Sequence, residues 1–431
     1  MTTLTHYQKT VRALSERLIL AQKPIRVLDS IKWDASIQAD FFKHKFKKLP
    51  PVTVDYYEKY KLSYNPVDKR AEFYNLGHDI RRQLGQFSSV GTIMQRMCHE
   101  YRELTRLIAY RGSSEFSKIS QELYGSSEDA FYAGAPTLKD LAEMLSSALG
   151  NLKDKNPVSS ALDEKCYTSE EAVENLQKRM TRYFHDAGRK VRVVLSDGII
   201  ADAAAGADII KIRKGKHFSE RDLRVLEVHE GWVHIGTTLN GQLQPICTFL
   251  SKGPPSSTVT QEGLAIIIEI LTAASYPDRV RRLNNRIVAI HMAEKGANFI
   301  EVFNFFREHN LSENDSYSNT VRVFRGSLPD GGGPFTKDLV YNKGFILIYN
   351  YIQVAIQQGE PKRIPLLFTG KTTLQDLRAL SELIEEGLVI PPKFVPPPFA
   401  DLAGLSAQMC YTNFISHLNW DRIAFDLKDI L

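Results

Sequence analysis

The chain has 431 residues, of which 43% are hydrophobic and 24% charged, a balance typical of a globular protein with about two domains. Its formal charge of +5 is too small to indicate nucleic-acid binding, and no apolar run approaches the ~20 residues of a membrane span. Four scattered cysteines without C-x-x-C spacing argue against a zinc ribbon and a disulfide scaffold. The N-terminus lacks the apolar core of a signal peptide, so we expect a cytoplasmic protein without a nucleic-acid or membrane partner and of unknown oligomeric state.

The N-terminal part is predicted to be mostly helical. Helical periodicity runs over Tyr7–Leu20, Ala71–Leu84 and Ser88–Tyr110, and Gly85 is placed to stop the second of these helices. The polar, proline-containing segment 152–157 is typical of a boundary. We therefore predict a helical N-terminal domain or extension over residues 1–155 and a catalytic domain over residues 156–431.

After this boundary, the pattern changes to a helix followed by short strands. A helix is predicted from Thr168 to His185, and β-like runs cover Val191–Ser196 and Asp208–Arg213, with the small residues 201–207 between them. One of these runs is expected to form an edge strand that holds an extended peptide by backbone pairing. The alternative is a strand that only builds the sheet.

A further helix is predicted from Glu220 to Leu239. Ser219 suits its N-cap, and Asp222 lies where the acidic residue of a capping box belongs. Asn240-Gly241 gives a stop signal.

This helix contains the sequence His229-Glu230-Gly231-Trp232-Val233-His234. Two imidazoles can bind Zn²⁺, and a carboxylate beside the first can accept a proton from water. The usual zinc-peptidase motif is H-E-x-x-H, whereas these histidines are five residues apart and diverge by about 140° around a regular helix. Both can reach one metal only if the helix widens or ends between them. Otherwise they are incidental residues of an amphipathic helix.

A third ligand is expected from the segment Thr260–Ala265. Glu262 is predicted to lie in the first turn of a helix over Gly263–Ala274, and Gly263 would let this helix approach the histidine helix closely. The alternative is a carboxylate that the helix dipole favours without any catalytic reason. Glu269 is a competing ligand, but its isoleucine-rich surroundings would leave its carboxylate hard to satisfy.

Downstream motifs suggest substrate handling. Arg322 and Arg325 follow a helical stretch from Ser312, and an arginine fork suits the terminal carboxylate of a peptide, although a surface salt bridge is the simpler explanation. Tyr341 lies near the start of a long helix and could donate to an oxyanion or satisfy a local hydrogen bond. Asp338 is expected to orient a ligand histidine or to cap its own helix.

The C-terminal region is predicted to contain a helix over Thr373–Glu386. The proline-rich passage Pro391–Pro398 is expected to form an extended strap packed on the domain.

Several of these motifs occur together in a known family. The run HEGWVH, then Asn240-Gly241, TQEGLA, RVFRG and FTKDLVY resembles the QEGLA-motif proteins, whose bacterial members are described as modulators of flavohaemoglobin expression. The same family includes the eukaryotic microtubule-associated tyrosine carboxypeptidases, which are zinc enzymes with an H-E-x-x-x-H motif. The resemblance extends from about Leu28 to beyond Tyr341 and is closer to the bacterial-type members.

The resemblance implies His229, His234 and Glu262 as zinc ligands and Glu230 as general base, and thereby favours Glu262 over Glu269. We thus expect an α+β fold that is mostly helical, with a small mixed or antiparallel sheet beside the zinc-binding helix, as in zincin-like metallopeptidases. The expected function is a zinc carboxypeptidase acting on a peptide or protein C-terminus, with Glu230 and Tyr341 as catalytic residues. The alternatives are a regulatory protein that binds a peptide in the old peptidase pocket and a hydrolase of non-peptide amides.

Overall fold

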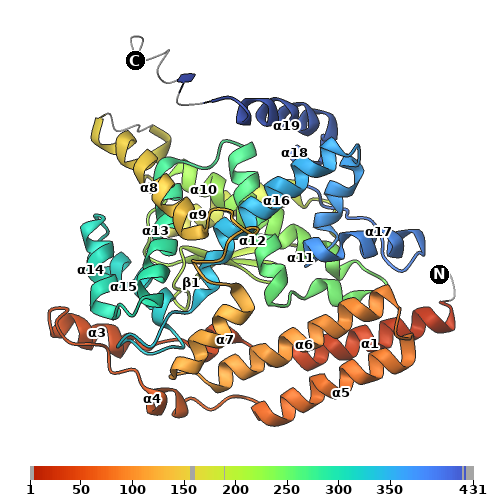
Figure 1. The fold of residues 1–431 in the computed structure, drawn as a ribbon, viewed down its shortest axis with the longest axis horizontal. Helices are drawn as coiled ribbons and strands as arrows, with labels where there is room; N and C mark the ends of the chain where they lie inside the picture. The colour runs from red at the N-terminus through yellow and green to blue at the C-terminus, as the bar shows by residue number, and fades with distance from the viewer. Residues whose placement is uncertain (1–3, 156–160, 189, 420–421, 424–431) are drawn as a thin grey trace.

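The computed structural model describes residues 4–155, 161–188, 190–419 and 422–423. Within these ranges, helices surround a small three-stranded sheet near the centre of the molecule (Figure 1). The prediction of a mostly helical fold with a small mixed sheet is confirmed.

The N-terminal helices begin and end at local signals in the sequence. Helix α1 (His6–Gln22) starts at a capping box formed by Thr5 and Gln8. Helix α5 (Pro66–Leu84) starts earlier than predicted, because Asn65 caps it and proline fits the first helical position, and it ends at Gly85 with a φ of 89°. Helix α6 (Ser89–Ala109) starts at the N-cap Ser88. The other elements of this part are α2 (Val27–Ser30), α3 (Ala35–Lys43), α4 (Val54–Glu58), α7 (Ser114–Tyr124) and α8 (Leu138–Lys155).

The sheet follows α9 (Ser169–Tyr183) and has the order β1-β3-β2. Its central strand β3 (Ile209–Arg213) pairs in parallel with β1 (Arg192–Ser196) and antiparallel with β2 (Ala203–Ala205). The run Asp208–Arg213 is therefore not an edge strand, and β1 and β2 form the two edges. Strand β2 arises from the small residues 201–207, where alanines give little sign of a strand.

The short helix η1 (Ala161–Asp163) precedes α9. After the sheet comes one continuous helical run. It consists of α10 (Glu220–Leu226), the π-helix η2 (Glu227–Ile235) and α11 (Gly236–Gln242). The predicted capping box of Ser219 and Asp222 is present. The helix continues through Asn240-Gly241, so the predicted stop is wrong. The Asn240 side chain instead donates to the carbonyl oxygens of Phe368 and Phe394 and accepts from the backbone N–H groups of Lys393 and Phe394.

These four hydrogen bonds fasten the C-terminal proline-rich passage to the helix. The passage is irregular up to α18 (Pro397–Ala400), which fits the predicted strap. The predicted helix over Thr373–Glu386 is present as η6 (Leu374–Asp376) and α17 (Leu377–Glu385).

Helices α12 (Pro255–Leu271) and α16 (Val340–Gln357) cross in the middle of the molecule (Figure 1). A Cβ atom at Gly263 would overlap the backbone of Gly344, and one at Gly344 would overlap the carbonyl oxygen of Val259. Gly263 thus permits a close approach to α16, and not to the histidine helix as predicted, because the atoms nearest to an added Cβ all belong to Gly344. The remaining elements are η3 (Thr248–Ser251), α13 (Pro277–Glu294), α14 (Phe299–Glu308), α15 (Glu313–Phe324), η4 (Thr336–Leu339), η5 (Pro361–Phe368) and α19 (Leu402–Ser416).

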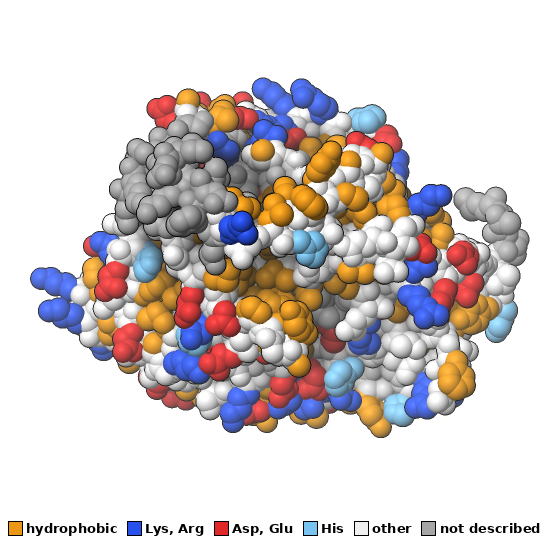
Figure 2. All heavy atoms as spheres, turned by 45° about the horizontal axis from the view of Figure 1, so that its top comes forward, with side chains coloured by type: hydrophobic (Ala, Val, Ile, Leu, Met, Phe, Trp, Pro, Cys, Tyr) orange, Lys and Arg blue, Asp and Glu red, His pale blue; other side chains and the backbone are white. Residues whose placement is uncertain are grey.

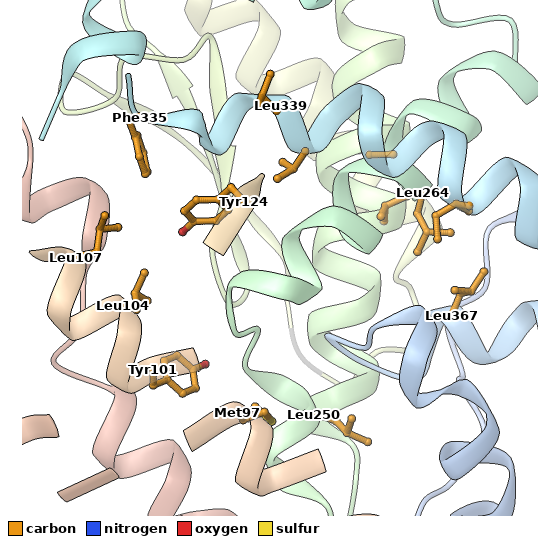
Figure 3. Packing of buried hydrophobic residues seen from close by; sticks show 14 of the residues in the cluster. Met97, Tyr101, Leu104, Leu107, Tyr124, Leu250, Leu264, Phe335, Leu339 and Leu367 are labelled. Atoms are coloured by element: carbon orange, nitrogen blue, oxygen red, sulfur yellow. The ribbon is translucent and has the colours of Figure 1, made fainter. Parts of the chain in front are cut away.

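A large hydrophobic cluster joins the N-terminal helices to the C-terminal half. It includes Met97, Tyr101 and Leu104 of α6 together with Leu264 of α12 and Leu339 (Figure 3). A smaller cluster lies between α9, the sheet and the start of α10. The division into 1–155 and 156–431 stays a prediction; residues 152–155 continue α8, and residues 156–160 lie outside the described residues.

The surface carries charges of both signs. On the face in Figure 2, lysines and arginines alternate with acidic residues around the rim, and hydrophobic side chains gather toward the centre. Among the described residues, no helix is both long and apolar enough to cross a membrane.

Candidate metal centre

The histidine motif lies in a π-helix. Helix η2 covers Glu227–Ile235 and contains both His229 and His234. In a π-helix the hydrogen bonds run from residue i to i+5, so residues five apart share a face. The predicted distortion of the helix between the two histidines is confirmed, and their ring centroids lie 4.9 Å apart.

Three potential ligand atoms converge at this site. Glu262 Oε2 lies 3.3 Å from His229 Nε2 and 3.5 Å from His234 Nε2, and one atom from each of the three residues lies within 4.8 Å of the others. Zinc bonds of about 2.0–2.2 Å at tetrahedral angles put ligand atoms roughly 3.3–3.5 Å apart. Glu262 Oε2 is also buried without a hydrogen-bond partner among the described residues. The donor set and its spacing therefore fit Zn²⁺.

Glu262 does not lie in the first turn of its helix, as predicted, but near the middle of α12. The helix begins earlier because Pro255 occupies its first turn, where proline is favoured. The helix dipole therefore does not explain a buried carboxylate at this position. Although burial by itself raises the pKa of Glu262, the neighbouring His234 and His229 hold it well below the usual value.

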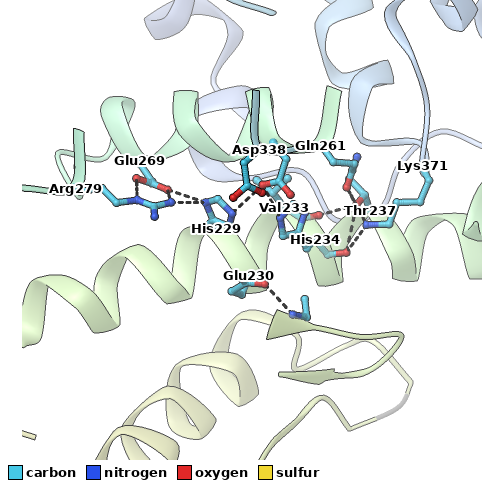
Figure 4. A network of polar contacts seen from close by, with 12 residues as sticks. His229, Glu230, Val233, His234, Thr237, Gln261, Glu269, Arg279, Asp338 and Lys371 are labelled. Carbon is cyan, nitrogen blue, oxygen red and sulfur yellow. Dashed lines mark hydrogen bonds and ion pairs between the residues drawn. The ribbon is translucent and has the colours of Figure 1, made fainter. Parts of the chain in front are cut away.

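Glu269 lies behind the ring of His229. Its Oε1 is 2.7 Å from His229 Nδ1, and Arg279 donates to both of its carboxylate oxygens, at 2.9 and 3.1 Å (Figure 4). The expectation that this carboxylate would lack partners is wrong, since Arg279 and His229 satisfy it. Burial raises the pKa of Glu269, but Arg279 and then His229 bring it down to about 2.

The electrostatics of His229 suit a cation. Burial lowers its pKa, but the carboxylates of Glu262 and Glu269 outweigh this effect and raise the pKa to about 9. A ring that prefers a positive charge between two carboxylates lies in a negative environment, which favours a bound metal ion.

Glu230 is held by the edge of the sheet. Its Oε2 accepts a hydrogen bond from the backbone N–H of Ala205 in β2, at 2.8 Å (Figure 4). Strand β2 is thus the edge strand beside the π-helix, and it passes next to the carboxylate predicted to be the base.

Lys371 supports the other end of the motif. Its Nζ donates to the carbonyl oxygen of His234, to Thr237 Oγ1 and to Gln261 Oε1, at 3.0, 3.1 and 2.8 Å (Figure 4). Burial lowers the pKa of Lys371 to about 7. These bonds join the end of the π-helix to the turn of α12 that carries Glu262.

Two hollows meet at the metal centre. The first, which we name the arginine pocket, is lined by His229, Glu230 and Tyr341 and by the arginines 279, 282, 286 and 322. Its apolar lining residues include Ile200, Phe218, Val225, Leu226 and Leu311. The second hollow is lined by Ala205, His234, Glu262 and Lys371, among others. The metal-binding residues thus lie between two hollows, with β2 along one side.

The two predicted substrate-binding arginines differ in position. Arg322 lines the arginine pocket, but Asp338 accepts two hydrogen bonds from its guanidinium, at 2.6 and 3.0 Å. Arg325 is buried over the ring of Phe335, at 5.7 Å, and is not among the residues that line the pocket. Asp338 pairs with Arg322 and not with a ligand histidine, and no side chain caps η4 or α16, so neither of its two predicted roles is confirmed. Substrate binding by either arginine stays a prediction.

Tyr341 lies beside the metal centre. Its ring centroid is 6.4 Å from that of His229, and its side chain lines the arginine pocket. Burial, followed by the charge of Glu262, raises the pKa of Tyr341 to about 12. The phenol therefore stays protonated near neutral pH and is able to donate a hydrogen bond, although the predicted catalytic role remains a prediction.

Some roles of the site residues were missed from the sequence. Glu269 was considered only as a competing ligand, although its seven-residue spacing from Glu262 places both on one face of α12 and also suits a partner of a ligand histidine. The arginines of α13 at positions 279, 282 and 286 show the same kind of pattern. These helical spacings could have found them. Lys371 lies outside regular structure and gave no such signal.

Comparison of the sequence with known proteins shows to which family the chain belongs. No curated protein sequence matches the chain. The family model described as microtubule-associated tyrosine carboxypeptidase matches residues 39–417, which is most of the chain and includes all residues of the metal centre. The chain therefore belongs to the microtubule-associated tyrosine carboxypeptidase family.

Proposed function

We propose that the protein is a zinc-dependent carboxypeptidase that removes the last residue of a peptide or protein. The observation that carries this proposal is the convergence of His229 Nε2, His234 Nε2 and the otherwise unpartnered Glu262 Oε2 beside Glu230. Membership of a carboxypeptidase family supports the same reaction class. A preference for tyrosine is suggested by the name of the family alone.

In this proposal His229, His234 and Glu262 hold the zinc ion. Zinc at this position would polarise a peptide carbonyl and lower the pKa of water toward ~7. Glu230 removes a proton from the attacking water and delivers it to the departing amine nitrogen. The N–H of Ala205 orients the carboxylate of Glu230 for this transfer.

The other residues bind and orient the substrate. Tyr341, protonated at neutral pH, donates to the oxygen of the carbonyl as it gains negative charge. Arg322 and Arg325 contribute positive charge around the end of the substrate, Arg322 at the pocket wall and Arg325 from behind it. An extended peptide that crosses from one hollow to the other would run along β2, the arrangement of zincin-like peptidases in which an edge strand pairs with substrate.

The test is mass spectrometry of a diverse peptide library incubated with zinc-loaded protein. We expect products shortened by one residue at the C-terminus, and no products with Glu230→Gln protein. Internal cleavage would replace the exopeptidase assignment by an endopeptidase. Peptides that bind but remain intact in the presence of the wild-type protein would refute the enzymatic function.

A further inference from the structure

The lining of the arginine pocket carries more positive than negative charge. Helix α13 places Arg279, Arg282 and Arg286 on one face, at spacings of three and four residues, and α15 adds Arg322. Arg279 pairs with Glu269, and Arg322 with Asp338. Carboxylates thereby balance the charges of these two guanidinium groups. Among the described residues, Arg282 has no carboxylate within ion-pair distance, and Arg286 has one that is already bound to Arg322.

Arg286 is the less well paired of these two. Its Nε is buried without a hydrogen-bond partner among the described residues. The carboxylate within ion-pair distance is Asp338, at 3.8 Å, and both oxygens of Asp338 already accept from Arg322. Burial, and then repulsion by Arg322, lower the pKa of Arg286 to about 10. Among the described residues, the guanidinium of Arg286 therefore has no carboxylate that pairs with it alone.

The Nε of Arg282 is likewise buried without a hydrogen-bond partner among the described residues, but its other nitrogens are better satisfied. Its terminal nitrogen donates to the hydroxyl of Tyr276, at 2.7 Å, and its guanidinium lies over the ring of that tyrosine. Tyr276 in turn donates to Asp222. Arg282 thus belongs to a hydrogen-bonded chain on the wall of the pocket.

Arg286 and the ligand His229 both lie beside Tyr341. The guanidinium of Arg286 lies over the ring of Tyr341, at 5.2 Å, and the Tyr341 ring lies beside that of His229. In an extended peptide, successive residues advance by at most about 3.6 Å, so the terminal carboxylate lies a short way beyond the last peptide bond. When that bond is at the metal centre, the receptor for the carboxylate must therefore lie close by, as Arg286 does beside Tyr341.

We infer that Arg286 receives the terminal carboxylate of the substrate and so restricts cleavage to the last peptide bond. The side chain of Arg286 lines the pocket, and two N–H groups of a guanidinium form the fork from which a carboxylate accepts two parallel hydrogen bonds. Asp338 keeps Arg322 from competing for the same carboxylate. This inference rests on the proposed carboxypeptidase function and adds the residue that makes it an exopeptidase.

The experiment compares two N-acetylated peptides that end in tyrosine and differ only in a free or an amidated C-terminus. We expect zinc-loaded wild-type protein to prefer the free acid. Arg286→Gln should raise KM for the free acid about 10- to 100-fold, the contribution of a charged hydrogen-bonded pair, and leave the amide almost unchanged. Arg286→Lys should retain part of the preference, because it keeps the charge but not the fork.

The matched control is Arg281→Gln. Arg281 lies on the same helix, pairs with Asp278 and does not line the pocket. It should leave the preference for the free acid intact. An unchanged ratio of free acid to amide in folded Arg286→Gln protein, as judged by circular dichroism, would overturn the inference while the carboxypeptidase assignment stands.

Equilibrium binding separates the inference from the proposed function. The same two peptides are titrated into Glu230→Gln protein with and without Arg286→Gln. Tighter binding of the free acid that disappears with Arg286→Gln supports the carboxylate receptor even if the wild type cleaves neither peptide, in which case the enzymatic proposal fails alone. Equal binding of the two peptides to Glu230→Gln protein would contradict the receptor.

Discussion

Glu269 Oε1 lies 2.7 Å from Nδ1 of His229, at the opposite side of the ring from Nε2, which faces Glu262 at 3.3 Å. The hydrogen bond to Nδ1 leaves Nε2 as the nitrogen available to a metal and fixes the orientation of the ring. Arg279 holds Glu269 in turn, so a chain of three side chains determines where one ligand atom points.

Replacing Glu269 by glutamine should therefore weaken zinc binding. The amide keeps the volume but removes the charge that orients His229 and balances Arg279, and losses of about 10- to 100-fold in affinity are typical of such partners. Competition with a chelator measures the dissociation constant. The exposed Glu308→Gln serves as the control and should bind zinc as the wild type does; an unchanged constant in Glu269→Gln would contradict the proposed role.

Two variants of the metal centre should show that zinc binding and turnover depend on different residues. Glu262→Ala removes a ligand and is expected to lose stoichiometric zinc after dialysis, measured by atomic emission. Glu230→Gln retains the three ligands and is expected to keep zinc at full occupancy while turnover falls by about 10²-fold or more, in line with loss of a general base. Full zinc occupancy in Glu262→Ala protein would refute the ligand assignment.

The crossing of α12 and α16 should not tolerate an added methyl group. Gly263→Ala and Gly344→Ala each force the backbones apart, and overpacking of this kind costs about 1–3 kcal/mol of unfolding free energy. Urea denaturation measures the loss. Gly150→Ala in α8, where nothing lies near the new atom, should instead be neutral or stabilise by up to ~1 kcal/mol. Equal stability of all three variants would show that the crossing is not tight in solution.

Asp338 should make stability depend on pH in the acidic range. Burial raises its pKa, but Arg322 and Arg286 together hold the value far below normal, so the folded state binds a proton less readily than the unfolded chain. Its contribution is therefore present above the ordinary carboxyl pKa of about 4 and is lost as the pH falls below it.

Asp338→Asn leaves Arg322 buried and unpaired, which should cost about 3–5 kcal/mol at pH 7. The difference from the wild type should shrink below pH ~4. Urea denaturation at pH 7 and pH 3 tests this expectation, and a difference of the same size at both pH values would contradict it.

Much of the site was accessible from the sequence because its chemistry is local. The five-residue spacing of His229 and His234 required a widened helix, and the capping box at Ser219 placed its start correctly. The start of α12 was predicted too late, at Gly263, although Pro255 fits the first turn of a helix.

Long-range partners could not be predicted in the same way. The pairing of Arg322 with Asp338, and of Gly263 with Gly344, depends on how distant segments pack. Strand β2 was not predicted for a different reason. Alanine has a low propensity for strands, and these alanines form one because they pair with β3.

The hydrogen bonds of Asn240 limit how the spacing between His229 and His234 can change. If one residue between Glu230 and His234 were removed and the rest of the helix kept its geometry, everything downstream would turn by about 100° and shift by ~1.5 Å. The Asn240 side chain would then leave all four of its backbone partners near Phe368 and Phe394. Asn240 keeps these partners only if the π-helix absorbs the deletion by narrowing to an α-helix, so the width of η2 links the spacing of the histidines to the position of the C-terminal segment.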